Sequence, residues 1–286
     1  PAAAQDADFG LSGFARMGLA YDDGSDETDL ETRFQLDARF EIVADAGLTF
    51  GGHARMRVDE GTGDAGFNQP RLFMSTGDLT LSVGNINGVI FNVPASFVGT
   101  GLDGNGSSGT PVYFAGAQNV TPLEYGSQGV SGTNGAQVDY AMGGFGFSAM
   151  YTDESSGASM TYSDNGVSIG VAYQQDDVAG GDDDTLIVAG ASYEINDLTV
   201  GAAYAVVDDA SMASDGTKVA VNASYAFSEA LSGSAFVATE DNGAGDGESY
   251  GVSMTRSLAP GVNFVAGFEQ NAAETNFMSA GVTMNF

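Results

Sequence analysis

Residues 30–42, LETRFQLDARFEI, alternate apolar and polar side chains almost without interruption. The even positions are apolar except Thr32, and the odd positions are all polar or charged. Successive side chains of a β-strand point to opposite faces, so this run predicts a strand with one apolar and one ionic face. At about 3.3 Å per residue it spans about 40 Å, which is longer than the usual strand of about 5 to 6 residues in a soluble sheet.

The composition limits how such a strand is used. The chain has 286 residues, of which 43% are hydrophobic, and it has no cysteine and no run of 18 apolar residues that would predict a membrane-spanning helix. Any passage across a bilayer must therefore use strands. The formal net charge of −30, from 38 acidic and 8 basic residues, excludes a nucleic-acid partner that requires a basic surface.

Strand-like alternation recurs along the whole chain with one long interruption. The expected strands lie at 8–21, 30–42, 47–59, 68–75 and 78–84, and then at 135–142, 144–152, 158–164, 166–175, 185–195, 197–207, 217–227, 230–240, 248–257, 261–270 and 275–286. Tight connectors such as SDNG at 163–166 alternate with longer and mostly acidic ones. This pattern predicts an all-β fold, a 16-stranded antiparallel up-and-down transmembrane β-barrel that takes up residues 1–286 as one domain.

The interruption after the fifth expected strand, at about 85–134, is rich in Gly, Ser, Asn and Pro. Apolar patches at 89–91 and 112–114 make it too hydrophobic for a solvated linker. A long irregular segment in a compact domain is usually functional, so we expect a loop folded against another part of the molecule.

Aromatic side chains of the apolar face fall at the strand ends, while aliphatic side chains fill the strand middles. Those expected near the long-loop end are Tyr21, Tyr151, Tyr173, Tyr204, Tyr250 and Phe268, and those near the tight-turn end include Phe9, Phe40, Phe50, Tyr140, Phe145, Tyr162, Tyr193, Tyr225, Phe227, Phe264 and Phe286. Two aromatic girdles around an aliphatic band indicate that this face meets lipid. The opposite, polar face should line water, because a barrel of about 16 strands leaves a channel.

Six of the eight basic residues lie in the first quarter of the chain, and the alternation places all of them on the polar face together with His53. They are Arg16, Arg33, Arg39, Arg55, Arg57 and Arg71. We consider two interpretations: an electrostatic filter in the channel, or a brace in which guanidinium groups pair with wall carboxylates. For the brace, Glu31, Asp37 and Glu41 are the expected partners of Arg33 and Arg39.

Acidic residues gather in short runs between the expected strands, and one run comprises Asp176, Asp177, Asp182, Asp183 and Asp184. Two interpretations remain open: solvated loops that keep the molecule soluble, or Ca²⁺ sites built from carboxylate oxygens. No run has the spacing of an EF-hand. We expect no other cofactor.

The chain resembles the trimeric general porins of Gram-negative outer membranes, most closely the alphaproteobacterial type. The resemblance is carried by the strand count, the long segment after the fifth strand, the acidic loops, the basic cluster and a last strand that places Ala280, Val282, Met284 and Phe286 on one face. It covers nearly the whole chain. Each single strand is a weak signal, and the set is a specific one.

The resemblance implies a homotrimer in the bacterial outer membrane, in contact with lipid and lipopolysaccharide, that lets small hydrophilic solutes and ions diffuse passively. It also implies that the long loop folds into the pore as a constriction and faces the basic wall with acids. Here the loop offers only Asp103 and Glu124 as such acids, which are few for such a loop, and Asp37 joins them from the wall. With a net charge of −30 and acidic mouths, we expect a weak preference for cations.

Two other functional classes share this fold. A barrel enzyme of the phospholipase or protease type would need a base, for which His53 is the sole histidine, but no nucleophile is paired with it by spacing. A structural or adhesive barrel with a plugged lumen would carry no current.

Overall fold

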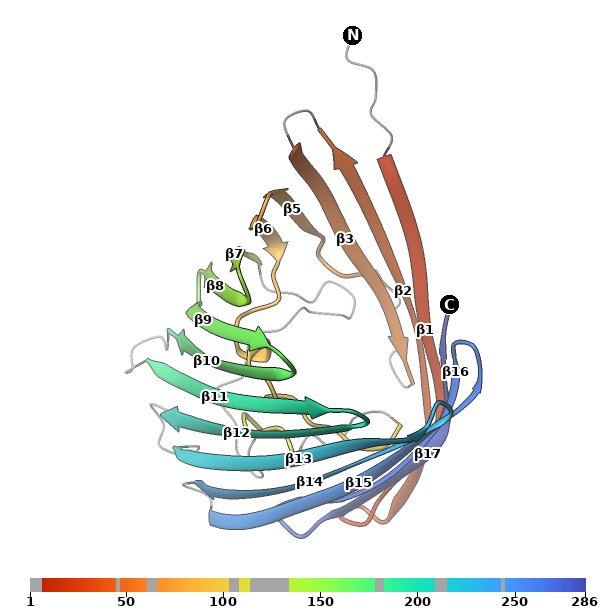
Figure 1. Cartoon of the computed structure of the whole chain (residues 1–286). Helices are drawn as coiled ribbons and strands as arrows, with labels where there is room; N and C mark the ends of the chain where they lie inside the picture. Colours follow the sequence, from red (N-terminus) through yellow and green to blue (C-terminus); the bar gives the residue numbers. More distant parts are fainter. Residues whose placement is uncertain are drawn as a thin grey trace.

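The strands pair edge to edge in one antiparallel ring (Figure 1). The computed structural model describes residues 7–44, 47–60, 66–102, 108–113, 134–177, 183–208, 215–242 and 245–286. These residues form sixteen long strands, the two-residue β4 and the short 3-10 segment η2. The bounds are β1 (Ala7–Asp22), β2 (Glu27–Val43), β3 (Leu48–Asp59), β4 (Gly66–Phe67), β5 (Arg71–Thr76), β6 (Leu79–Asn85), η2 (Ile90–Asn92), β7 (Asn134–Met142), β8 (Phe145–Thr152), β9 (Ser155–Asp164), β10 (Val167–Asp176), β11 (Asp184–Ile195), β12 (Leu198–Asp208), β13 (Gly216–Ser228), β14 (Leu231–Asn242), β15 (Gly245–Ala259), β16 (Val262–Gln270) and β17 (Asn276–Asn285).

The first and last strands close the ring. β1 pairs with β2 along its whole length and with β17 from Phe14 to Asp22. Hydrocarbon offers no partner to a free N–H or C=O group, so closure satisfies the backbone of both edge strands. No helix among the described residues is long and apolar enough to cross a membrane. The predicted closed 16-stranded barrel is confirmed.

The strand that carries the regular alternation, β2, shows which face is outside. Leu30, Phe34 and Phe40 have exposed side chains on the outer surface. Glu31 and Asp37, on the other face, form ion pairs with residues of β1 and β3. The same arrangement holds around the ring, where large apolar side chains of most strands are exposed. The barrel is therefore apolar outside and polar inside, as a lipid environment requires.

Tight two-residue turns connect neighbouring strands at one end of the barrel. Asn165 and Gly166 connect β9 to β10 with φ angles of 48° and 79°. Positive φ at both central residues defines the two-residue turn whose twist matches the flanking strands, and Asn-Gly is a preferred sequence for it. Gly143 and Gly144 make the equivalent turn between β7 and β8, with φ angles of 54° and 90°.

Some connectors at the other end are shorter than the sequence pattern predicts. Asp153 and Glu154 alone join β8 to β9, and β14 continues through Glu240 and Asp241 before β15 begins at Gly245. The acidic residues were expected in long loops, but interstrand backbone hydrogen bonds form whatever the side-chain charge. A further difference lies at 68–75, where the regular strand begins only at Arg71 because Pro70 has no N–H group to donate.

Candidate pore constriction

The segment that follows β6 lies inside the barrel (Figure 1). We call it the inner loop, and it is described over residues 86–102 and 108–113. Along its path, Ile86 contacts β7, Val89 contacts β9, Pro94 contacts β10 and β11, and Leu102 reaches β17 and β1. Over residues 86–102 the inner loop thus follows the inner wall strand by strand, in the order of the ring, and residues 108–113 run back from β16 to β13.

Nine glycines mark this path, and we call them the glycine track: Gly135, Gly157, Gly170, Gly190, Gly201, Gly251, Gly267, Gly281 and Gly18. A Cβ atom at any of them would lie within 3.0 Å of an atom of the inner loop, a separation that real Cβ atoms essentially never show. Glycine therefore lets the loop backbone approach the wall. Gly190 is the tightest position, because its Cβ would meet the carbonyl of Pro94.

Apolar side chains of the inner loop pack on apolar side chains of the wall. Ile86, Val89, Ile90, Val93 and Val112 form one buried cluster with the wall residues Met150, Ala172, Leu186, Val188, Ala205 and Val207. The sequence pattern led us to expect a polar inner face that does not pack. That expectation is wrong for β8 and β10–β12, because the loop shields this part of the wall from water.

Buried charges hold residues 100–102 and 108–113 of the inner loop, and we call Lys218, Glu240 and Glu269 the loop anchor. Lys218 Nζ lies 2.8 Å from Glu240 Oε2 and donates a hydrogen bond of 2.5 Å to the carbonyl of Tyr113. Glu269 accepts hydrogen bonds from Thr100 Oγ1 at 2.8 Å and from the Ser108 backbone N–H at 3.0 Å. All three side chains are buried, so removing one partner would leave a costly buried charge.

The opposite part of the wall carries the arginines. We call Arg16, Arg33, Arg39, His53, Arg55, Arg57 and Arg71, on β1, β2, β3 and β5, the arginine wall. Its first group of contacts joins Arg16 to Glu31 at 2.8 Å. Asp59 is shared by Arg33 and Arg57, at 2.5 and 2.7 Å. Guanidinium groups on neighbouring strands are thus held side by side by shared carboxylates.

A second group of contacts centres on Asp37. Its carboxylate accepts hydrogen bonds from Arg55 at 2.8 Å and from Gln35 at 2.7 Å, and lies 2.7 Å from His53 Nε2. Arg39 is exposed on the same face of β2. The register places both Arg39 and Arg71 directly opposite His53, from the two neighbouring strands. All seven predicted basic residues therefore gather on one wall.

The predicted carboxylates have different positions. Asp37 lies in the arginine wall, while Asp103 and Glu124 lie outside the described residues. Glu31 pairs with Arg16, and Arg33 pairs with Asp59, whereas the sequence led us to expect Glu31, Asp37 and Glu41 as partners of Arg33 and Arg39. The inner loop carries no charged side chain over its described residues.

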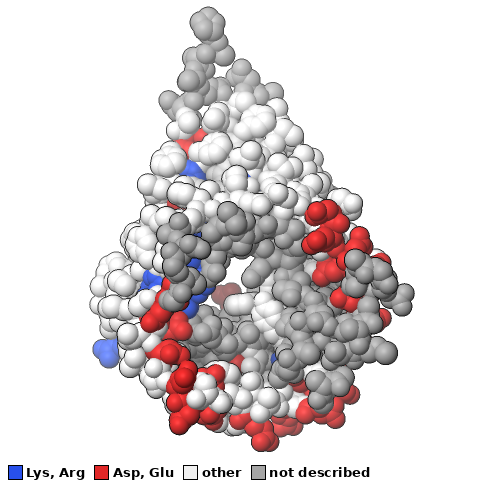
Figure 2. All heavy atoms as spheres, turned by 180° about the vertical axis from the view of Figure 1, so that it is seen from behind, with Lys and Arg blue, Asp and Glu red and all other residues white. Residues whose placement is uncertain are grey.

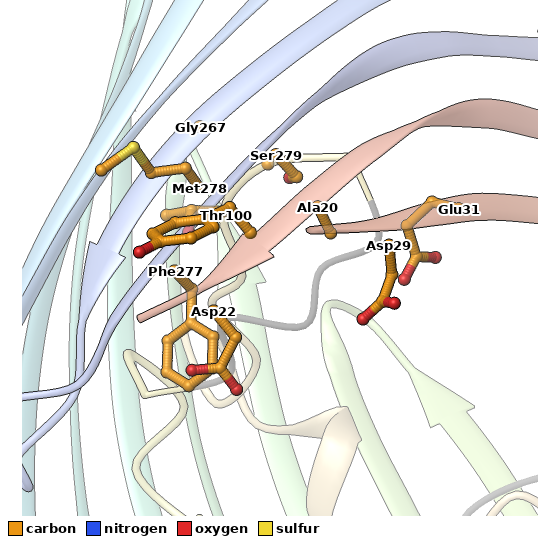
Figure 3. A pocket seen from close by; sticks show the side chains of 11 residues that line it. Ala20, Asp22, Asp29, Glu31, Thr100, Gly267, Phe277, Met278 and Ser279 are labelled. Carbon is orange, nitrogen blue, oxygen red and sulfur yellow. The ribbon is translucent and has the colours of Figure 1, made fainter. Parts of the chain in front are cut away.

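A cavity of about 290 Å³ lies where the tip of the inner loop meets β1, β2, β16 and β17. Thr100 and Gly101 of the inner loop line one side of the cavity, and Ser279 of β17 lines the side formed by the barrel wall. Figure 3 shows the carboxylates of Asp29 and Glu31 together on β2 and that of Asp22 at the end of β1. Three carboxylates thus line this cavity, and Glu31 connects it to Arg16 of the arginine wall.

Comparison with known proteins settles the family. The family profile described as Gram-negative porin matches residues 1–276. The chain is a member of the Gram-negative porin family. A curated porin from Fuscovulum blasticum is 27% identical over 215 residues, which cover 67% of this chain and 71% of that protein.

Solved structures of the Rhodopseudomonas blastica porin share the fold. A quintuple mutant superposes with a TM-score of 0.84 at 24% identity, covering 98% of this chain and 100% of that one. A triple mutant of the same porin gives a TM-score of 0.82 at 25% identity, with the same coverage. The protein is thus an outer-membrane porin of a Gram-negative bacterium, and it forms a channel.

The acidic run that suggested Ca²⁺ sites spans the hairpin between β10 and β11 of the porin. Asp176 and Asp184 face each other in register at the strand ends, and Asp183 accepts a hydrogen bond from Gln175. Asp177 follows β10, while Asp182 lies outside the described residues. Within the described residues, no three acidic or histidine side chains gather in an arrangement that would hold a metal. Ca²⁺ binding at this run stays a prediction.

Sequence reasoning missed the residues that position the inner loop of the porin. Lys218 is the sole lysine of the chain and occupies the inner face of β13. Glycines recur near the middle of many strands, where β-branched residues are usual. These two signals were present in the sequence, but their meaning depends on which strands the loop crosses.

Proposed function

We propose that small hydrophilic solutes and ions diffuse passively between the inner loop and the arginine wall, and that this wall filters them electrostatically. The observation that carries the proposal is the gathering of seven basic side chains on β1, β2, β3 and β5, beside a lumen that the inner loop narrows from the other side. Charge and diameter at such a narrowing decide which solutes pass.

We also propose a weak preference for cations. Figure 2 shows acidic side chains gathered along the rim and basic ones beside the central opening. The net charge of −30 should enrich cations near the mouths, while the arginine wall opposes their passage. The reversal potential in a planar bilayer under a salt gradient tests this balance, and clear anion preference would overturn it.

The rival interpretation of the arginine wall is a structural brace. Replacing Arg33 and Arg57 together by Gln distinguishes the two roles, because both share Asp59. A filter predicts a reversal potential shifted further toward cations. A brace predicts a loss of stability with an unchanged reversal potential.

Trimer formation and contact with lipopolysaccharide belong to the same proposal and are supported by family membership. Light scattering of the detergent-solubilised protein measures the number of copies, and a monomer at all protein concentrations would contradict the trimer. Binding of purified lipopolysaccharide is measured on the same sample.

An enzymatic role for His53 is the alternative we consider weaker. Its Nε2 contacts Asp37, which Arg55 and Gln35 also contact, and this arrangement is consistent with a role in the wall. His53→Ala should leave the conductance largely intact. A hydrolytic activity that this substitution abolishes would support the enzyme instead. Absence of any single-channel current would support a plugged barrel.

A further inference from the structure

Two phenylalanines of the inner loop lie together in the lumen. Phe97 is 57% exposed and Phe91 is partly buried, and their ring centroids are 5.7 Å apart with the planes at 83°. The inner loop runs along the inner wall, so an exposed side chain on it faces the channel rather than lipid. A phenyl group held in water buries little apolar area, and exposed apolar surface of this kind often marks a contact site.

The two rings lie across the barrel from the arginine wall. Between them along the chain, Pro94 and Ala95 contact the glycine track on β10, β11 and β12. In a ring of sixteen long strands, these are six to eight places from β2 and β3. Further along the loop, Leu102 reaches Gly18, which is only two residues from Arg16. A permeating solute therefore meets phenyl rings on one side and guanidinium groups on the other.

We propose that Phe97 and Phe91 form a binding subsite for small aromatic carboxylates in the channel. The solute ring would contact the Phe97 ring while its carboxylate faces the arginine wall. The lumen admits small solutes, which restricts the occupant to permeating molecules. Contact between two aromatic rings contributes about 0.5–1.5 kcal/mol beyond the area buried, which corresponds to about a two- to twelvefold change in affinity. This proposal rests on the proposed channel function.

The test is partial block of single-channel current in a planar bilayer. Benzoate is the probe, acetate is the carboxylate without a ring, and benzylammonium is the ring with the opposite charge. Benzoate should reduce the current in a saturable way, acetate should not, and benzylammonium should block at least threefold more weakly. Phe97→Leu keeps an apolar side chain but removes the ring, and should weaken benzoate block about two- to twelvefold. Phe147→Leu, on the lipid face, is the matched control and should change nothing.

The outcomes separate this subsite from the channel itself. No current in potassium chloride alone would overturn the channel function and the subsite with it. A normal current with equal effects of benzoate and acetate would overturn the subsite alone. Benzoate block that is unchanged in Phe97→Leu, or equal block by benzylammonium, would also overturn it.

Discussion

The two sides of the lumen are built in different ways. The arginine wall includes the exposed Arg39 and the buried Arg16 and His53, and it is held by ion pairs between neighbouring strands, such as the pairs of Asp59 with Arg33 and Arg57. The side with the glycine track is covered by the inner loop and contains a small hydrophobic cluster together with the loop anchor. One side supplies charged groups, and the other holds the inner loop in place. The proposed filter function therefore predicts that selectivity and pore size depend on separate sets of residues.

The largest loss of stability is expected at the loop anchor, on the side of the lumen that the inner loop covers. Lys218→Met should lower the free energy of unfolding by about 3–5 kcal/mol, because it leaves Glu240 buried without its cation. Reversible urea unfolding in lipid vesicles measures the loss. Lys218→Met combined with Glu240→Leu should recover most of it. Equal stability of the single variant and the wild type would contradict the anchor.

The next largest loss of stability is expected on the outer, lipid-facing surface of the barrel. Val221 is exposed on the lipid side of β13, so Val221→Arg should cost about 2–4 kcal/mol near the bilayer midplane. The same vesicle assay provides the value. Ser224→Arg is the matched control on the opposite face of the same strand and should cost much less. The reverse order of the two costs would mean that the faces are assigned the wrong way round.

A larger side chain in the glycine track should displace the inner loop and leave the arginine wall unchanged. Gly190→Val would place a Cβ against the carbonyl of Pro94 and should cost about 1–3 kcal/mol through overpacking. The displaced loop should also change the single-channel conductance. Gly10→Val is the control, because no atom lies within 4 Å of a Cβ at that position. Unchanged conductance in Gly190→Val would show that the loop does not set the pore size.

The smallest effect concerns a surface contact that belongs to neither wall. Asp23, between β1 and β2, accepts hydrogen bonds from the side chain and the backbone N–H of Asn276, and these hold its carboxyl pKa below the ordinary value. A lowered folded-state pKa stabilises the fold above the ordinary carboxyl pKa, and this contribution fades as the pH falls through the folded-state pKa. Asn276→Ala should raise the Asp23 pKa toward its ordinary value, as followed by carboxyl NMR.

The control for this titration is Asn196→Gly, at the tight-turn end of the barrel. Asn196 has a φ angle of 53°, which glycine adopts readily, so the Asp23 pKa should stay lowered. An Asp23 pKa that is unchanged in Asn276→Ala would contradict the assigned cause.

Alternation carried most of the fold prediction, because period two fixes both the strand and the face of each side chain. It placed Arg33 inside and Phe34 outside from local sequence alone. It did not identify Asp59 as the partner of Arg33, because that contact depends on the register between β2 and β3. The path of the inner loop was equally hidden, since Pro94 and Gly190 lie far apart in the chain and their contact follows from closure of the ring.

Closure of the ring also has a consequence for how the molecule assembles. Nearly every strand pairing joins successive segments of the chain, while β1 must find β17 across almost the full length of the polypeptide. Contacts of such large sequence separation are slow to form because the chain entropy is lost before they are made. The pairing of β1 with β17, which includes Met17 opposite Val282, should therefore be the last to form. Until then, two unpaired edges remain open to neighbouring chains.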